Sequence, residues 1–540
     1  MKQKIDNIFP EQDQIPDSFK FLQTIEQREY LINDEIRTWN GNMQKVYSPI
    51  YIKSGEEYTN YIGSYPLMEK EHAIEALNSA EKAYNNGKGK WPTMSIADRI
   101  KCLKNFIFFM KEKRDEVVKM LMWEIGKSLN DSQKEFDRTI DYISDTIEAL
   151  KDLDRSSSRF IISQNVISQI RRAPLGIVLC MGPYNYPLNE TFTTLIPALI
   201  MGNTIIFKPP KLGVLLHRPL LEAFKKSFPP GVINTVYGEG EKVISPLMKT
   251  GKINVLAFIG SSRVADILKK QHPKPHRLKC VLGLEAKNTA IVLQDAELES
   301  VVKECVLGAI SFNGQRCTAL KIIFVHKKIV NEFIEQFNLE LSKLTIGMPW
   351  DKNVSITPLP EPNKSEYLTG LINDAIKHGA KIANTNYGGG YSNKSFFYPA
   401  VLFPVNEKMR IYREEQFGPV IPIISFENIK KPLDYVIKSS YGQQASIFGQ
   451  NTDTIAKLVD TLVNQVCRVN INSQCQRGPD ILPFTGRKDS AEGTLSVSDA
   501  LKIFSIRTLV ATKDNELNKN IISTIVKEQK SNFLSTDYIF

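Results

Sequence analysis

The sequence has 540 residues, of which 42% are hydrophobic and 24% are charged. Those fractions are typical of a folded globular protein and not of a disordered chain, and the length predicts two or three domains with a cleft between them. The net charge of +10 is spread along the chain and does not gather in a tail. It therefore does not indicate a nucleic-acid partner, but a mildly basic protein suits a small anionic substrate and cofactor.

The seven cysteines are widely spaced and include no C-x-x-C pair. This pattern excludes a disulfide framework and a zinc motif, and it predicts a reducing compartment and no bound metal. Residues 1–15 lack the apolar core of a signal peptide, and no apolar run is long enough to cross a bilayer. We therefore expect a cytoplasmic protein without a membrane partner.

Residues 1–40 form a predicted N-terminal extension. From 69 to about 151, apolar residues recur at three- and four-residue intervals, which predicts helices. From 176 onward, short apolar runs alternate with helical patterns. The predicted strands are 176–182, 204–210, 232–240 and 253–261, and the predicted helices between them are 187–202 and 215–228. Such alternation is typical of a parallel sheet that binds ligands at the carboxyl ends of its strands.

A second alternating block runs from about 286 to 488 and predicts a second α/β domain. Its stretch 378–396 contains three consecutive glycines. No strand-to-helix frame surrounds them, so we interpret this stretch as a surface loop and not as a phosphate cradle.

Two further stretches, 160–174 and 494–512, have strand character outside both blocks. Isolated strands that bury little in their own domain predict an arm that pairs across a subunit interface. Residues 513–540 show no clear pattern.

The candidate nucleophile is Cys317 in SFNGQRCT, at the end of a turn that Asn313 and Gly314 form. Beside the permanently charged Arg316, its thiolate is favoured, which is how a cysteine becomes reactive near neutral pH. The alternative is a small buried core residue. Asn185, in GPYNYP at a predicted strand end, is a candidate donor to the oxyanion that such a nucleophile creates.

Six motifs together indicate a family. GPYNYP, FKPPK, FIGSS, GLEAKN, FNGQRC and EEQFGP occur in the order and approximate spacing of the aldehyde dehydrogenase superfamily, which the chain resembles from about residue 40 to 512. FNGQRCTALK and SQCQRGPD resemble most closely the NADP-dependent, non-phosphorylating glyceraldehyde-3-phosphate dehydrogenase branch.

The resemblance implies an α/β aldehyde dehydrogenase-like fold with a Rossmann-like cofactor domain, a catalytic α/β domain and a small β arm that builds a homotetramer. Its predicted boundaries are a cofactor domain at 41–285 interrupted by an arm strand at 157–175, a catalytic domain at 286–489, a second arm segment at 490–512 and a tail at 513–540.

The resemblance also implies a mechanism. A thiolate at Cys317 attacks the aldehyde, hydride passes to the nicotinamide, and water hydrolyses the resulting thioester to a free acid. The side chain of Asn185 and the backbone N–H of Cys317 hold the oxyanion.

The cofactor prediction rests on charge. Lys208 matches a family lysine that contacts the adenosine ribose, and Lys211 stands where NAD-preferring relatives often have a glutamate. A lysine there attracts the 2′-phosphate of NADP, whereas a carboxylate repels it; the alternative is a solvated surface lysine. The family positions for the rest of the cofactor correspond to Gly260, Ser261, Glu415 and Phe417.

The predicted substrate is a phosphorylated small aldehyde. A phosphate dianion requires more than one cation, and arginine suits it geometrically. The phosphate-binding positions of the branch correspond to Arg138, Tyr186, Arg316 and Arg477. Each arginine has a structural ion pair as its alternative role.

One motif departs from the family. Members usually carry the general base in Glu-Leu-Gly-Gly-Lys, but this chain has Gly283 at the glutamate position and Glu285 two residues later. Residues two apart in an extended segment point the same way, so we predict that Glu285 is the base. The alternatives are deacylation through Glu415 or a positioned water, and impaired hydrolysis with another acyl acceptor. Two wider alternatives are a dehydrogenase for another aldehyde and an inactive nucleotide-binding member of the fold.

Overall fold

The computed structural model describes residues 1–21 and 23–537. Two parallel sheets dominate it. The first has the strand order β10-β9-β8-β11-β12-β26, and only the last pairing is antiparallel. Its strands are β8 (Ile177–Met181), β9 (Thr204–Lys208), β10 (Ile233–Thr235), β11 (Val255–Ile259), β12 (Lys279–Gly283) and β26 (Ala491–Glu492). The predicted strands of this block are confirmed, because uninterrupted apolar runs are buried on both faces of a parallel sheet.

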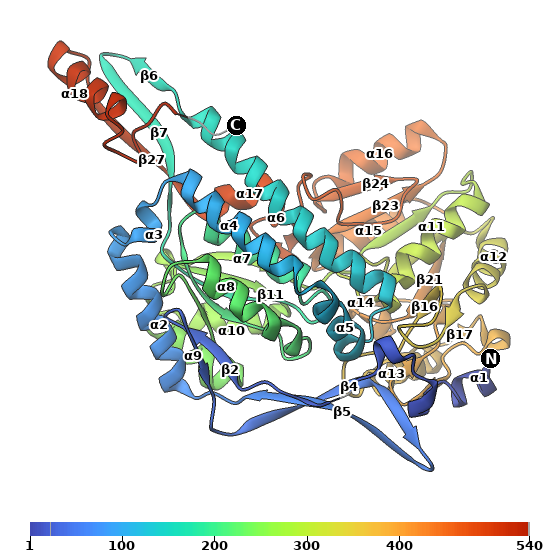
Figure 1. Ribbon diagram of the computed structural model, residues 1–540. Helices are drawn as coiled ribbons and strands as arrows, with labels where there is room; N and C mark the ends of the chain where they lie inside the picture. The colour runs from blue at the N-terminus through green and yellow to red at the C-terminus, as the bar shows by residue number, and fades with distance from the viewer. Residues whose placement is uncertain (22, 538–540) are drawn as a thin grey trace.

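Helices cover this sheet and confirm the helical prediction for 69–151 (Figure 1). They are α2 (Lys70–Tyr84), α4 (Ile96–Lys111), α5 (Arg114–Ile125), α6 (Leu129–Ser157), α7 (Asn189–Ile200), α8 (Leu221–Ser227), α9 (Gly240–Lys249) and α10 (Ser262–Gln271). The longest, α6, begins where the Ser128 side chain accepts a hydrogen bond from the backbone N–H of Asp131.

The second sheet has the order β17-β20-β21-β14-β13-β23-β24. Its strands are β13 (Thr289–Val292), β14 (Ile322–His326), β17 (Lys381–Ile382), β20 (Ala400–Phe403), β21 (Val420–Phe426), β23 (Gln444–Phe448) and β24 (Arg468–Ile471). Its main helices are α11 (Leu298–Ile310), α12 (Val330–Ser342), α13 (Lys364–Lys377), α15 (Lys430–Lys438) and α16 (Thr452–Leu462). The glycines at 388–390 lie in a loop before the short hairpin of β18 (Ser392–Asn393) and β19 (Phe396–Phe397), as predicted.

The N-terminal segment packs along the body. It contains α1 (Lys2–Asp6), β1 (Ile25–Glu26) and the hairpin of β2 (Glu29–Ile32) and β3 (Glu35–Thr38), followed by the long hairpin of β4 (Met43–Ser54) and β5 (Glu57–Pro66). The backbone N–H of Leu31 donates to the Thr235 hydroxyl over 2.8 Å, which attaches this segment to the first sheet.

A three-stranded antiparallel arm projects from the body (Figure 1). It consists of β6 (Phe160–Ser163), β7 (Val166–Pro174) and β27 (Ser505–Lys513). The strand prediction for 494–512 is wrong in its first part, because residues there form helix α17 (Val497–Ile503). Val497, Ala500 and Leu501 have helical spacing and are buried.

The C-terminal tail also differs from expectation. It forms α18 (Glu516–Lys527), which Asn515 caps by accepting from the backbone N–H of Asn518. Within 1–21 and 23–537, no helix is both long and apolar enough to cross a membrane.

Candidate active site

A cavity of about 580 Å³ lies at the carboxyl ends of strands from the first sheet. All three predicted catalytic residues and all six predicted cofactor residues line it: Cys317, Asn185, Glu285, Lys208, Lys211, Gly260, Ser261, Glu415 and Phe417. The parallel register produces this convergence, since it pairs Met181 with Lys208 and Ile259 with Gly283 at the ends of neighbouring strands.

A tight turn positions Cys317. Phe312, Asn313 and Gly314 all have positive φ, at 50°, 55° and 70°, and the Asn313 side chain stabilises this backbone. It donates to the Thr357 carbonyl over 3.0 Å and accepts from the Thr357 N–H over 3.1 Å. The predicted Asn-Gly turn is therefore present.

The electrostatics of Cys317 differ from the prediction. Burial raises the pKa of its thiol, the charge of Glu190 raises it further, and Lys321 and Arg477 lower it. The Arg316 guanidinium instead donates to the Gly308 carbonyl and the Gln474 side chain, each over 3.2 Å. The cations with the largest effect on the sulfur are therefore Lys321 and Arg477 and not the predicted Arg316.

Two side chains missed by the sequence analysis hold the backbone of Cys317. Asn288 Nδ2 and Lys321 Nζ donate to its carbonyl oxygen over 2.7 and 3.0 Å. Both contacts anchor the peptide plane that follows the sulfur. Asn288 directly follows the GLEAK stretch, but no local pattern distinguishes it from a turn residue.

Asn185 reaches the same loop from the opposite sheet. Its Nδ2 donates to the Gln315 carbonyl over 2.8 Å. A fully buried ion pair between Lys127 and Glu135 fixes the Asn185 loop, since Lys127 Nζ donates to the Asn185 carbonyl over 2.8 Å. The Glu135 carboxylate also accepts from the backbone N–H groups of Leu188 and Asn189.

The cofactor side of the cavity is cationic. Lys208 ends β9, and burial together with the neighbouring Lys211 lowers the pKa of its ammonium group to about 8. A phosphate near these two lysines would offset their mutual repulsion and favour the charged ammonium groups, so the pair fits the 2′-phosphate of the predicted cofactor.

The side chain of Glu285 contacts the start of α10. Its carboxylate accepts from the backbone N–H of Ser262 over 2.8 Å, at the positive end of the helix. Gly283, at the usual base position, has little room beside it: a Cβ there would lie 3.3 Å from Ile259 Cγ1. Glu285 shares the cavity with Cys317, but as the base it would have to release this N–H.

Glu415 has partners of its own. It forms an ion pair with Lys321 at 2.5 Å and accepts from the Ala286 N–H over 3.2 Å. Phe417, with φ of 41°, places its ring edge-on to that of Tyr184 at 5.9 Å between centroids. These contacts order the cavity wall opposite Lys208.

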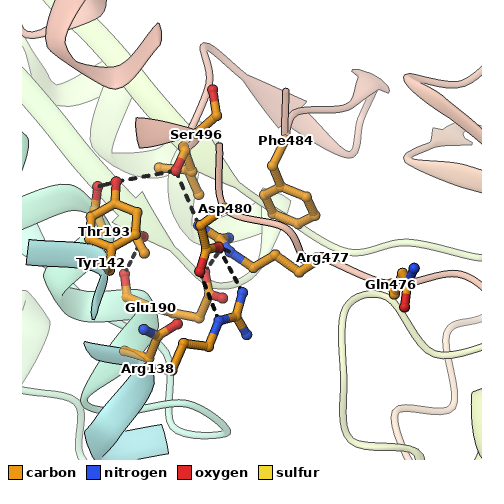
Figure 2. A network of polar contacts seen from close by, with 12 residues as sticks. Arg138, Tyr142, Glu190, Thr193, Gln476, Arg477, Asp480, Phe484 and Ser496 are labelled. Carbon is orange, nitrogen blue, oxygen red and sulfur yellow. Dashed lines mark hydrogen bonds and ion pairs between the residues drawn. The ribbon is translucent and has the colours of Figure 1, made fainter. Parts of the chain in front are cut away.

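Two of the three predicted phosphate-binding arginines, Arg138 and Arg477, belong to an internal ion network (Figure 2). Arg138 and Arg477 both donate to Asp480, with shortest distances of 2.7 and 3.2 Å. Arg477 also pairs with Glu190 at 2.6 Å, and its guanidinium lies 4.3 Å from the centre of the Phe484 ring.

The network brings together only part of the predicted set. Arg316 points to Gln474, and the ring of Tyr186 faces Lys127 Nζ at 3.6 Å. None of the four predicted phosphate-binding residues is among those lining the cavity, whereas Glu190 is. The four are Arg138, Tyr186, Arg316 and Arg477. Glu190 was missed, although it lies only three residues after the end of the GPYNYP motif.

Comparisons with known proteins show which family this chain matches. The model of the aldehyde dehydrogenase family matches residues 52–509. An NADP-dependent glyceraldehyde-3-phosphate dehydrogenase of Streptococcus equinus is 33% identical over 474 residues, covering 87% of this chain and 94% of that protein. A lactaldehyde dehydrogenase of Methanocaldococcus jannaschii is 31% identical, covering 83% and 94%. The crystal structure of a Bacillus halodurans NADP-dependent glyceraldehyde-3-phosphate dehydrogenase complexed with NADP covers 91% of this chain and all of that one, with a TM-score of 0.82 and 29% identity.

Proposed function

The chain belongs to the aldehyde dehydrogenase family and is an oxidoreductase, and on that premise we propose that it oxidises D-glyceraldehyde 3-phosphate to 3-phosphoglycerate with NADP, without phosphate uptake. The observation that carries the proposal is the single cavity that contains Cys317, Asn185 and the Lys208–Lys211 pair. It supplies a nucleophile, an oxyanion donor and a cationic site for a 2′-phosphate. The glyceraldehyde-3-phosphate dehydrogenases among the relatives support the same substrate and cofactor.

The chemistry begins when the Cys317 thiol loses its proton to solvent water in the cavity. Its thiolate adds to the aldehyde carbon and forms a thiohemiacetal, whose oxygen accepts hydrogen bonds from Asn185 Nδ2 and the Cys317 N–H. Asn185 Nδ2 gives up its hydrogen bond to the Gln315 carbonyl in order to donate to this substrate oxygen. NADP, when bound, accepts the hydride that leaves the substrate carbon, and a thioester remains. Water then adds to the thioester and the C–S bond breaks. The acid leaves, and the thiol of Cys317 is regenerated.

The base that activates this water is Glu285 in our proposal. A carboxylate within reach of the acyl carbon is what general-base hydrolysis requires. The Glu285 carboxylate must first leave the Ser262 N–H. A bound anion at the start of α10 can displace this carboxylate, because the anion and the carboxylate compete for the same positive helix end. Glu415 is the alternative base, held in the ground state by Lys321.

The substrate phosphate binds, in this proposal, to Arg477 and Arg138. Both already contact carboxylates, so a dianion has to replace Glu190 on Arg477. Burial raises the pKa of the Glu190 carboxyl, which favours its taking up a proton when the phosphate arrives.

The same ion pair favours a second candidate function. An Arg477 that keeps Glu190 as its partner offers a polar but charge-balanced wall, which suits an uncharged hydroxyaldehyde. The relative described as a lactaldehyde dehydrogenase supports this alternative.

The direct test is to mix the purified protein with D-glyceraldehyde 3-phosphate and NADP in phosphate-free buffer and follow NADPH absorbance. We expect NADPH formation and a much higher kcat/KM than with lactaldehyde. A preference for lactaldehyde selects the second candidate, and no activity with any aldehyde and either cofactor supports an inactive member of the fold.

Glu190→Gln separates the two substrates further. Removing the competing charge should lower KM for glyceraldehyde 3-phosphate by about ten-fold, equivalent to roughly 1.4 kcal/mol, and leave KM for lactaldehyde little changed. The matched variant Arg477→Leu should raise KM for the phosphorylated aldehyde only. Equal effects on both substrates would contradict the phosphate role of Arg477.

A further inference from the structure

A second cavity, of about 400 Å³, lies at the root of the arm. Helices α4 and α6, strand β7 and the C-terminal tail enclose it, in the region where the arm meets the body in Figure 1. Its charged wall residues are Arg99, Arg171, Arg172, Lys530 and Asp154. Four positive groups therefore face one negative group, an imbalance that the catalytic cavity does not explain.

Arg99 is the unusual member of this wall. Its side chain lines the cavity, the residue is only 5% exposed, and its Nε and Nη1 have no hydrogen-bond partner among the described residues. Gly202, with φ of 94°, makes room for it, because a Cβ there would lie 2.2 Å from Arg99 Nη1. A buried guanidinium without an acceptor is unfavourable unless an anion reaches it.

The other cations have partners, and Arg171 connects the cavity to the tail. Arg171 forms an ion pair with Asp154 and donates from Nη1 to the carbonyls of Phe533 and Ser535, at 3.2 and 3.3 Å. Arg172 bonds Ser505 Oγ over 2.7 Å and has no acidic partner among the described residues. Lys530 pairs with Glu528 at 2.6 Å. The Asp154 carboxylate pairs with Arg171, and its charge also acts on Arg99. One carboxylate therefore faces the three guanidinium groups, and two positive charges are left unbalanced.

The shape of the cavity defines the ligand class. Two unbalanced guanidinium groups suit a dianion, and the planar arginine fork matches phosphate oxygens. The remaining wall includes Leu150, Met201 and Phe533, and the volume lies within the range of small-molecule sites. An organic group attached to the phosphate would contact these apolar side chains.

We propose that this cavity binds a small phosphate-bearing organic anion through Arg99 and Arg172, and that the ligand holds the C-terminal tail against the body. The site is distinct from the catalytic cavity but shares a helix with it. Glu190 at the start of α7 lines the catalytic cavity, and Met201, directly after α7, lines this one.

The test uses the full chain and inorganic phosphate as the probe, at constant ionic strength. Calorimetric titration measures binding, and hydrogen–deuterium exchange of peptides covering 92–99 and 528–537 locates it. We expect phosphate to slow exchange in both peptides of the wild type. Arg99→Met should weaken this response by at least about ten-fold, since it removes the charged donor, with kcat/KM for the aldehyde retained.

Two further variants keep the test decisive. Arg277→Met removes an exposed arginine elsewhere and should leave the response intact. Should Arg99→Met fail to fold, Arg99→Lys keeps a charge without the fork and should still weaken binding. Three results would overturn the proposal. In the first, phosphate does not change hydrogen exchange in the wild type. In the second, phosphate protects the wild type and Arg99→Met equally, and in the third, Arg99→Lys binds phosphate with unchanged affinity.

Discussion

Cys317 is partly buried in the wall of the candidate active-site cavity, and this environment favours the protonated thiol. Burial and the charge of Glu190 raise its pKa, and the opposing cations Lys321 and Arg477 do not reverse this. A thiol in this environment becomes reactive once a ligand or a proton removes the negative charge of Glu190. Reactivity and phosphate binding then depend on the same carboxylate.

The thiol itself can be titrated to test this. In Glu190→Gln the pKa of Cys317 should fall, so alkylation by iodoacetamide should be faster than in the wild type at neutral pH, because only the thiolate reacts. The rate is measured against pH, with Cys317→Ser as the control for the other cysteines. An unchanged profile would show that Glu190 does not act on the sulfur.

The identity of the base is a second question at the level of single residues. Glu285→Gln should slow deacylation by about 10² or more, since general-base catalysis contributes on that scale. A burst of NADPH followed by a slow steady state is the expected signature in stopped-flow measurements. If Glu285→Gln turns over normally and Glu415→Gln shows the burst, Glu415 is the base.

The end of strand β9 places Lys208 beside Lys211, and this arrangement predicts a pH dependence of cofactor binding. The pKa of Lys208 is about 8 without ligand, so its ammonium group is charged below that pH and loses its charge above it. NADP affinity should therefore fall as pH rises through about 8, measured by fluorescence titration. Lys211→Ala removes the repelling neighbour and should move this fall to higher pH, whereas an identical profile would contradict the coupling.

The turn before Cys317 depends on a position that tolerates only glycine. A Cβ on Gly314 would lie 2.8 Å from the Ala309 carbonyl oxygen and 2.9 Å from that of Gly418, at a φ of 70°. Gly314→Ala should lower the free energy of unfolding by about 1–3 kcal/mol and reduce kcat by displacing the sulfur. Denaturant unfolding and steady-state kinetics measure the two effects.

A matched change distinguishes strain from a general loss of stability. Gly370→Ala lies in α13, where a Cβ meets no atom within 4 Å, and should be neutral or stabilising. Equal effects of both substitutions on kcat would contradict a local role for Gly314.

The whole molecule presents an arm whose apolar side chains face outward. Ile162, Ile506 and Leu509 are 62%, 51% and 58% exposed. Exposed apolar residues on a projecting sheet favour burial in a subunit interface. The homotetramer itself stays a prediction from the family resemblance.

Leu509→Lys tests this assembly. If the arm forms the predicted interface, a charge there should convert the predicted tetramer to smaller species in light-scattering measurements. Leu339→Lys, at a 53% exposed position of α12 on the body, is the matched control and should not change the mass. A wild-type monomer at micromolar concentration would contradict the prediction.

Much of this fold follows from local sequence patterns. Buried strands such as β8, β9 and β11 are uninterrupted apolar runs, and their ends supply the residues that line the catalytic cavity. Helix α17 was missed because its seven residues lie between strand-like flanks, and α18 because none of its residues is buried. Apolar residues have helical spacing in both segments, at Val497, Ala500 and Leu501 and at Leu517, Ile521 and Ile525. Both helices are short, at seven and twelve residues, so this local pattern is weak evidence on its own.

The sequence by itself determined the strands, the family and the residues that meet at the catalytic cavity, since these depend on side-chain period and on short motifs. Only the tertiary structure decided which charges neutralise one another. Arg138 meets Asp480 from 342 residues away and Arg477 meets Glu190 from 287. Nε and Nη1 of Arg99 have no hydrogen-bond partner within residues 1–21 and 23–537. Coulomb interactions depend on distance through space and on burial, and neither can be derived from the order of residues along the chain.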